Sequence, residues 1–263
     1  MSAERQAEAG ASGRLYLIPN LLGVTPPQAV LPERTIGIAR SLAHFVVETP
    51  KAARQFLKAL APERPLQSLT LSELNEHTPA HRVEALLAPA LAGYDLGLLS
   101  DAGCPGVADP GAGLVAAAHR VGVRVVPLVG PSAVLLALMA SGMNGQAFAF
   151  HGYLPAKPGL RERTLRALDA ALARSGATQL FIETPYRNEA LLAAILSSCR
   201  AETRLCVALD LSLPSEQIIS RDIASWRKLE RPVLARRPAI FLLGNDQWSV
   251  AGTAARVTRP ASS

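Results

Sequence analysis

Apolar residues in the first half of the chain fall into short continuous runs, separated by longer segments with helical spacing. The runs of strand length cover 14–18, 44–47, 66–71, 96–99 and 123–128. The segments between them repeat apolar residues every three to four positions and predict helices over 32–42, 51–60, 80–91 and 114–121. Strands and helices that alternate in this way are typical of βαβ units, so we expect an α/β domain over 14–130 with a parallel sheet.

The pattern changes beyond Gly142, and a second α/β domain is expected over 131–245. The predicted strands are 148–150, 179–182, 205–209, 217–219 and 239–243, and the predicted helices are 134–141, 161–173 and a segment ending at 196, with a loop at 151–157. The strands at 205–209 and 217–219 are expected to pair, which gives a mixed sheet. The polar segments 1–13 and 246–263 are expected to be disordered tails, and the first lacks the apolar core of a signal peptide.

Loops rich in glycine and proline follow three predicted strands of the first domain. The stretch 98–113 holds four glycines, two prolines and two aspartates, more than a simple strand-to-helix turn needs. Shorter loops of the same character lie at 19–23 and 129–133. Ligands bind at the carboxyl ends of parallel strands, so the three loops could converge on one crevice, with Asp101 supplying a carboxylate. Asp109 is interpreted as the cap of the next helix, with Pro110 in its first turn.

Composition and charge narrow the class of protein. The chain has 263 residues, 49% of them hydrophobic, which is ample for a core, and no apolar run is long enough to span a bilayer. Three cysteines without metal-ligand spacing indicate reduced thiols, a cytoplasmic protein and no metal site. The net charge of +6 is compatible with an RNA partner, although the same basic residues could serve solubility alone.

Five motifs carry a resemblance to a known family. They are Leu15-Tyr16-Leu17-Ile18-Pro19, Ser100 to Gly111, Gly130-Pro131-Ser132-Ala133, Gly152 to Lys157 and Glu183-Thr184-Pro185-Tyr186-Arg187. In this order they resemble the tetrapyrrole methylase superfamily, which are S-adenosylmethionine-dependent methyltransferases of a non-Rossmann fold. Within that group the chain looks most like the branch of bacterial 16S rRNA ribose 2'-O-methyltransferases. The resemblance implies two α/β domains of the tetrapyrrole methylase type, S-adenosylmethionine (SAM) as methyl donor, a role in rRNA processing and a homodimer.

The resemblance also implies a set of site residues. Carried over by position, the SAM-binding residues would be Pro19, Asp101, Ala102, Gly103, Pro105, Val107, Ser132, Ala133, Phe181 and Ile182. The loop from Asp101 to Gly103 would contact the methionine part, and the strand end at Phe181 would lie against the adenosine. Backbone groups and a carboxylate suit the charged end of this ligand, while apolar walls suit the adenine.

Three residues are candidates for catalysis. Glu183 and Arg187 could position or deprotonate an acceptor hydroxyl, or they could form only a local ion pair, four residues apart at a helix start. Glu48 could act in the same way, or it could serve only to compensate a helix dipole. The residues next to it depart from the rRNA enzymes, since Glu48-Thr49-Pro50-Lys51 stands where those enzymes have Glu-Asp-Thr-Arg.

Three functions stay open at the level of sequence. Methylation of RNA or another large polar acceptor is favoured by the basic second half of the chain. A small acceptor such as a tetrapyrrole would need a deep apolar cavity, for which an aromatic content of 5% gives little support. A protein that binds SAM without turnover would explain the departures on the acceptor side.

Overall fold

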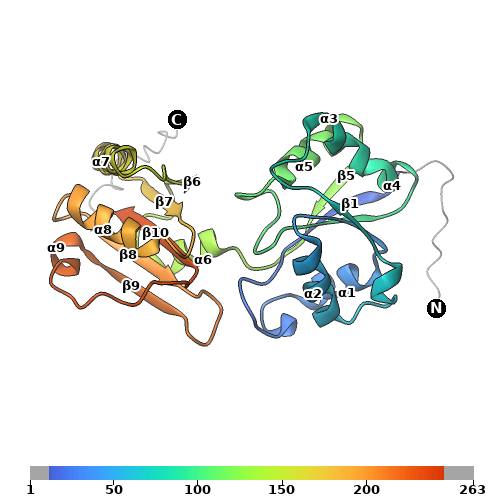
Figure 1. Ribbon diagram of the computed structural model, residues 1–263, viewed down its shortest axis with the longest axis horizontal. Helices are drawn as coiled ribbons and strands as arrows, with labels where there is room; N and C mark the ends of the chain where they lie inside the picture. Colours follow the sequence, from blue (N-terminus) through green and yellow to red (C-terminus); the bar gives the residue numbers. More distant parts are fainter. Residues whose placement is uncertain (1–11, 246–263) are drawn as a thin grey trace, which may run out of the picture. The chain divides into compact units, whose positions relative to one another are not determined.

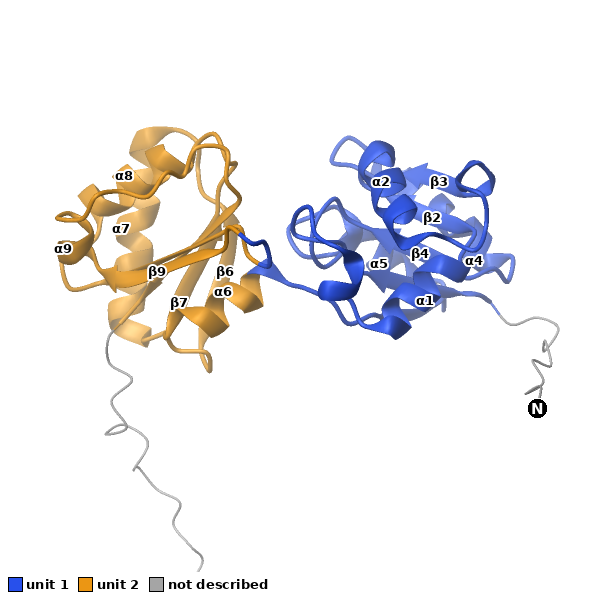
Figure 2. Ribbon diagram, turned by 90° about the horizontal axis from the view of Figure 1, so that it is seen from below, with its two compact units in different colours: residues 1–133, 212–214 blue, residues 134–211, 215–263 orange. Residues whose placement is uncertain are grey.

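The computed structural model of the chain describes residues 12–245 (Figure 1). The chain divides into two compact units, residues 1–133 with 212–214 and residues 134–211 with 215–263 (Figure 2). The division after residue 133 lies close to the boundary expected after residue 130. The segment 212–214 belongs to the first unit although the chain on both sides of it belongs to the second. The tails expected at 1–13 and 246–263 lie outside the described residues, except for residues 12 and 13.

The first unit is built on a parallel sheet, as predicted. Its strands are β1 (Arg14–Ile18), β2 (His44–Val47), β3 (Thr70–Glu73), β4 (Leu96–Leu99) and β5 (Arg124–Pro127), in the spatial order β3-β2-β4-β1-β5. Every neighbouring pair is parallel. Strand β4 is buried along its whole length, which explains its uninterrupted apolar run. The loops that follow β1, β4 and β5 therefore leave the sheet at the same edge, from three adjacent strands.

Helices cover both faces of this sheet. Alternate strand residues point to opposite sides and form two separate core clusters. One cluster joins the sheet to α1 (Glu33–Ser41) and α2 (Pro50–Leu60), and the other joins it to α5 (Gly111–Arg120) and the 3₁₀ turn η3 (Glu84–Leu87). Helix α2 begins as expected, with Thr49 at the N-cap position and Pro50 as its first residue.

Two predicted elements of the first unit are wrong in detail. The strand expected at 66–71 is instead a 3₁₀ turn, η2 (Leu66–Ser68), followed by β3, whose start is set by pairing of Thr70 with His44. The helix expected over 80–91 is broken into α3 (Ala80–Val83), η3 and α4 (Ala88–Leu91). Pro89 accounts for the break because it has no N–H to donate within a continuous helix. A further 3₁₀ turn, η1 (Pro27–Ala29), follows β1.

The second unit is built on a mixed sheet, also as predicted. Its strands are β6 (Phe148–Tyr153), β7 (Thr178–Ile182), β8 (Arg204–Leu209), β9 (Gln217–Asp222) and β10 (Ala239–Gly244), in the spatial order β6-β7-β10-β8-β9. Only β6 and β7 run parallel. Strand β6 extends through His151, Gly152 and Tyr153, which were expected in a loop, and its register with β7 shifts between Phe150 and Tyr153. This irregularity conceals the strand from a search for simple alternation.

The helices of the second unit are α6 (Ala133–Ser141), α7 (Pro158–Ser175), α8 (Asn188–Ser198) and the short α9 (Ile223–Trp226). Buried residues of α7, α8 and α9 join β7, β8 and β10 in one core cluster. Trp226 closes this core, and its indole Nε1 donates a hydrogen bond of 2.9 Å to the carbonyl of Leu205.

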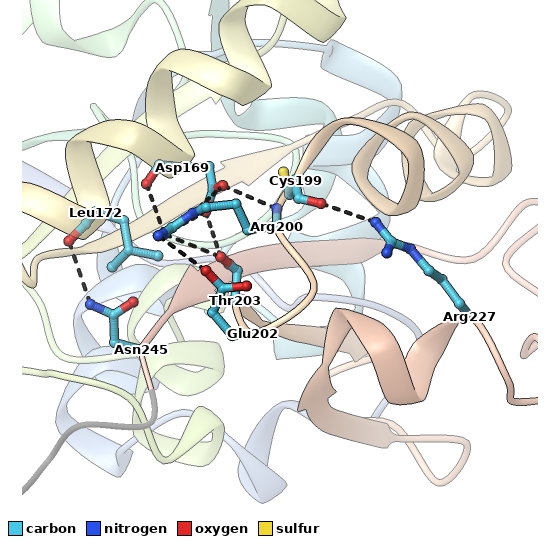
Figure 3. Close-up of polar contacts among 8 residues, drawn as sticks. All are labelled: Asp169, Leu172, Cys199, Arg200, Glu202, Thr203, Arg227 and Asn245. Carbon is cyan, nitrogen blue, oxygen red and sulfur yellow. Dashed lines mark hydrogen bonds and ion pairs between the residues drawn. The ribbon is translucent and has the colours of Figure 1, made fainter.

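An ion pair between a buried carboxylate and a partly exposed arginine ties α7 to the turn before β8 (Figure 3). The Asp169 carboxylate accepts hydrogen bonds from Arg200 Nε at 2.8 Å, from the Arg200 backbone N–H at 3.1 Å and from the Thr203 hydroxyl. Burial alone would raise the pKa of Asp169, but the hydrogen bonds from Arg200 and Thr203 and the charge of Arg200 outweigh it, so the pKa is lowered.

No helix within residues 12–245 is long and apolar enough to cross a membrane. Over the same range, no group of three or more histidine, cysteine, aspartate or glutamate side chains is placed to hold a metal ion.

Candidate functional site

The loops after β1 and β4 are joined by direct hydrogen bonds. The backbone N–H of Asn20 donates to the carbonyl of Gly103 at 2.8 Å, and that of Gly103 donates to the carbonyl of Asn20 at 3.2 Å. The buried Asn20 side chain donates to the carbonyls of Ser100 and Asp101 at 2.9 and 3.1 Å. Gly103 has a φ of +67°, which favours glycine at this crossing point. Asn20 could have been singled out in the sequence because it lies at the end of a predicted strand, directly after Pro19.

The loop after β5 packs against the other two. The Cys104 thiol lies 3.4 Å from the carbonyl oxygen of Pro131, to which it donates. Gly130 sits so close to Pro19 that a Cβ added there would fall 2.4 Å from the proline Cβ. The three glycine- and proline-rich loops therefore meet at one edge of the sheet, as the sequence indicates, and their close packing gives the edge a defined shape.

Asp101 makes contacts within the protein that the sequence does not predict. Its carboxylate accepts hydrogen bonds from the Thr49 backbone N–H at 3.1 Å and from the Thr49 hydroxyl at 2.7 Å. In return, the Asp101 backbone N–H donates to Glu48 Oε2 at 3.0 Å. Asp101 therefore ties the loop after β4 to the start of α2, and it brings Glu48 into the same site. Both carboxylates still face solvent in part.

The pKa values of Glu48 and Cys104 are shifted by their surroundings. Burial raises the pKa of Glu48, and the hydrogen bond from the Asp101 N–H offsets only part of this. Burial also raises the pKa of the Cys104 thiol, partly offset by a hydrogen bond with Ser132. The direction of this shift disfavours the thiolate, which is the reactive form of a cysteine.

The far end of the loop after β4 holds its own shape. Asp109 Oδ1 accepts hydrogen bonds from the backbone N–H groups of Gly106 and Gly111, at 2.8 and 2.7 Å. Asp109 thus caps α5 as expected, but Pro110 stands at the N-cap position and not in the first turn. Of the residues expected to bind SAM, Pro105 is buried inside this loop and Val107 is exposed.

A groove of about 270 Å³ borders the tip of the same loop. Its walls come from the loop after β1, from one side of α2 and from the tip of the loop after β4. The residues that line it are Asn20, Leu21, Leu22, Gly23, Val24, Thr25, Ala52, Gln55, Phe56, Ala59, Asp101 and Ala102. Most of these side chains are apolar, and Phe56 forms a buried part of the lining. All of them belong to the first unit.

The exposed side of α2 next to the groove is basic. Lys51, Arg54 and Lys58 recur at intervals of three and four residues, so they lie on one stripe of the helix. All three are exposed, and none makes an ion pair or side-chain hydrogen bond within the described part of the chain. The groove-lining residues Ala52, Gln55 and Ala59 occupy the adjacent stripe, so the cations stand along its rim.

The remaining residues expected to bind SAM fall into two places. Ser132 and Ala133 end the first unit, where both are partly buried. Phe181 and Ile182 belong to the second unit, and Phe181 is fully buried in its core, where its ring lies parallel to that of Phe241 at a centroid separation of 6.2 Å. Ile182 is partly exposed and points to the opposite face of the sheet.

Glu183 and Arg187, at the end of β7, form the local ion pair that the sequence allows. Glu183 Oε1 accepts from Arg187 Nη2 at 2.6 Å and from the Thr184 N–H at 2.7 Å. The Glu183 side chain is completely buried, whereas that of Arg187 is 41% exposed. Glu183 Oε2 and Arg187 Nε are buried without a partner among the described residues. One oxygen of this carboxylate thus accepts no hydrogen bond from the described residues.

Residues near this pair were missed in the sequence. Asp210, directly after β8, accepts from Arg237 Nε at 2.8 Å and from the Ser215 hydroxyl at 2.8 Å. Asn188, at the start of α8, donates to the carbonyl of Arg237 at 2.7 Å. In the sequence, Asp210 directly follows one predicted strand and Arg237 shortly precedes another, and this placement could have indicated that the two residues pair.

Comparisons with known proteins find a matching family model, relatives and a solved structure of similar fold. The family model for tetrapyrrole (corrin/porphyrin) methylases matches residues 32–225. The chain is 38% identical to the ribosomal RNA small subunit methyltransferase I of Xylella fastidiosa, over 74% of this chain and 68% of that protein. It is 30% identical to the protein of the same name from Vibrio cholerae, over 80% of this chain and 69% of that protein. Its fold is similar to the crystal structure of the methyltransferase CobJ, with a TM-score of 0.60, 19% identity and coverage of 89% of this chain and 95% of that chain.

Proposed function

The chain belongs to the tetrapyrrole methylase family and is a SAM-dependent methyltransferase, and from this premise we propose that its acceptor is ribosomal RNA. The observation that carries the proposal is the name shared by the relatives, which are described as ribosomal RNA small subunit methyltransferases over most of this chain. The likeness to CobJ supports only the fold.

The first unit offers groups that fit SAM. The tip at Asp101 and Ala102 is exposed and borders a groove whose walls are mainly apolar, while the carboxylate of Asp101 supplies negative charge at one end. We propose that Asp101, Ala102 and Gly103 hold the charged methionine part, beside Pro19, Ser132 and Ala133. When bound, SAM supplies an electrophilic methyl group on its sulfonium. We propose that the groups of the chain around it orient the donor for the displacement.

The role of Asp101 can be tested apart from its contact with α2. Asp101→Ala is expected to weaken SAM binding by roughly 1 to 3 kcal/mol, because a charged hydrogen-bond partner is lost. Thr49→Val removes the hydroxyl that donates to Asp101 but keeps the carboxylate, and it should weaken binding far less. Calorimetric titration of both variants with SAM makes the comparison. Equal losses would show that Asp101 serves only to anchor α2.

The groove and its basic rim favour an acceptor with phosphate groups. Lys51, Arg54 and Lys58 stand unpaired within the described part of the chain, beside a groove that begins at the proposed donor tip. Unpaired cations of this kind bind phosphates and release counterions, and apolar walls suit the face of a base. A tetrapyrrole would instead need a deep apolar cavity.

Methyl transfer from labelled SAM into ribosomal RNA tests the acceptor. We expect label in RNA and none in small molecules. Lys51→Gln/Lys58→Gln should raise the KM for RNA with little change in kcat, and should lower the slope of log affinity against log salt by about one for each phosphate that is no longer neutralised. Arg34→Gln/Arg40→Gln makes the same charge change on α1, which does not line the groove, and should leave the KM near that of the native chain. Label confined to small molecules would overturn the proposal.

We propose that two carboxylates, those of Glu183 and Glu48, take part in catalysis. As the methyl group is transferred to an acceptor hydroxyl oxygen, that hydroxyl must lose its proton. Glu183 has an unpartnered oxygen among the described residues and is held in place by Arg187, so we propose it as the group that accepts or orients this proton. Glu48, with its raised pKa, is the second candidate.

We also propose that the protein acts as a homodimer in the cytoplasm, where ribosomal RNA is found. Apolar side chains left exposed on the second unit support self-association, notably Leu135 at 51% and Met139 at 79% exposed on α6. Light scattering by the full chain tests this, since a dimer has twice the mass of one chain.

A further inference from the structure

The buried side of α7 carries two charged residues, and only one of them has a partner among the described residues. Arg161 and Asp169 lie on the stripe of this helix that also buries Leu165, Leu168 and Leu172. Arg161 is 7% exposed and Asp169 is 4% exposed. Asp169 is neutralised by Arg200, but the Arg161 side chain makes no hydrogen bond or ion pair within residues 12–245. The second unit therefore pairs one charged residue on this side of α7, Asp169, and leaves the other, Arg161, without a partner among the described residues.

A buried guanidinium N–H without an acceptor opposes folding. Arg161 Nε is inaccessible to solvent and has no acceptor within the described range. Burial of a cation without a partner is costly, and proteins ordinarily avoid it or pair it. The Nη groups of Arg161 are not among the buried atoms without a partner, so they are the donors that an anion from solution can contact.

The start of α7 provides the other half of an anion site. The helix is 18 residues long, its N-cap residue Lys157 makes no side-chain cap, and its first turn contains no acidic residue. The N–H groups of Gly159 and Leu160 have no acceptor within the helix, and the positive end of the helix dipole lies there. Side chains of a helix lean towards its N-terminus, which brings the Arg161 guanidinium over this first turn. The residues 157–160 are all exposed, so a ligand can reach the site.

We propose that Arg161, Lys157 and the first turn of α7 bind a phosphate group of the RNA acceptor. That the phosphate belongs to RNA rests on the proposed function. That the site binds a phosphate at all rests only on the residues at the start of α7. A guanidinium offers two parallel N–H donors to a phosphate, and free backbone N–H groups at a helix start donate to the remaining oxygens. This site lies on the second unit, whereas the groove residues belong to the first.

The chemistry is tested by thermal unfolding of the full chain in inorganic phosphate and in chloride at equal ionic strength. Phosphate at about ten times its dissociation constant or more should raise the Tm of the native chain by roughly 2 to 4 °C, and Arg161→Gln should abolish that rise. Arg174→Gln, at the exposed far end of the same helix, should keep it. In chloride, Arg161→Gln should melt at the native temperature or above, because an unpaired buried charge has been removed. If Arg161→Gln lowered the Tm equally in both salts, Arg161 would be merely structural and the site would be refuted.

The source of the phosphate is tested by RNA binding across a range of salt concentrations. Arg161→Gln should weaken RNA binding about 3- to 10-fold and lower the slope of log affinity against log salt by about one, and inorganic phosphate should compete. Stabilisation by phosphate with unchanged RNA affinity would mean that the site binds the free ion, and would overturn its assignment to RNA. Because the phosphate measurement uses no RNA and no methyl transfer, its failure is distinguishable from failure of the proposed function.

Discussion

Replacement of Glu183 by glutamine should lower the rate of methyl transfer by about 10²- to 10⁴-fold while the chain stays folded. Glutamine keeps the shape of the side chain and an oxygen that can accept from Arg187 and Thr184. Its NH2 group then occupies the position of the unpartnered Oε2, and this group is only a donor and cannot accept a proton. The expected loss is therefore in kcat, with SAM affinity unchanged.

The measurement is single-turnover transfer of labelled methyl, with calorimetric titration and thermal unfolding on the same samples. Asp210→Asn is the matched control, because Asp210 is also a buried carboxylate paired with an arginine at a strand end of this unit, but both its partners are identified. It should retain most of the activity of the folded chain. If the Glu183→Gln variant transfers methyl within about threefold of the native rate, Glu183 has only a structural role in its ion pair with Arg187. Glu48 would then become the first candidate for the group that accepts the proton.

The second large effect is expected for stability, at the ion pair between α7 and the turn before β8. Arg200→Ala should lower the free energy of unfolding by about 3 to 5 kcal/mol, because it leaves the Asp169 carboxylate buried without its cation. Asp169→Ala should cost less, about 1.5 to 3 kcal/mol, because the side chain of Arg200 is 42% exposed and regains water. Denaturant titration of both variants at neutral pH shows which substitution lowers the free energy of unfolding more. A larger loss for Asp169→Ala than for Arg200→Ala would contradict this prediction.

The pH dependence of this pair follows from the sign of its shift. The folded pKa of Asp169 is lowered, so the unfolded state binds the proton more tightly, and the stabilisation is present above the unfolded pKa of about 4. It is lost as the pH falls through the lower, folded pKa. Denaturant titration at a series of acidic pH values should therefore show a smaller loss of stability for Asp169→Asn than for the native chain.

Much of the sheet architecture could be predicted because the apolar pattern within each short segment indicates whether that segment forms a strand or a helix. Strand β4 is apolar without interruption because it lies in the middle of a parallel sheet covered on both faces, and α2 has a strong apolar side and a proline start. The failures have local causes as well. Pro89 interrupts a segment with helical spacing, and the irregular pairing of β6 leaves no clean alternation.

The candidate site was predicted unevenly. The loops after β1, β4 and β5 could be recognised because glycine and proline mark special backbone shapes at strand ends. The partners of Asp101 could not, since Thr49 is 52 residues away in sequence and approaches only when β2 and β4 pair. The burial of Phe181 was missed for the same reason, because which face of β7 meets the core depends on the helices that cover it.

The sequence by itself therefore determined the kind of fold and the class of chemistry, through strand runs, helical spacing and the ordered motifs that identify a methyltransferase family. Only the tertiary structure decided which polar atoms of the described residues are paired and which are left without a partner. It paired Asp169 with Arg200 and left Glu183 Oε2 and Arg161 unmatched. The physical reason is that secondary structure depends on near neighbours along the chain, whereas the pairing and burial of a charge depend on residues that folding brings from afar.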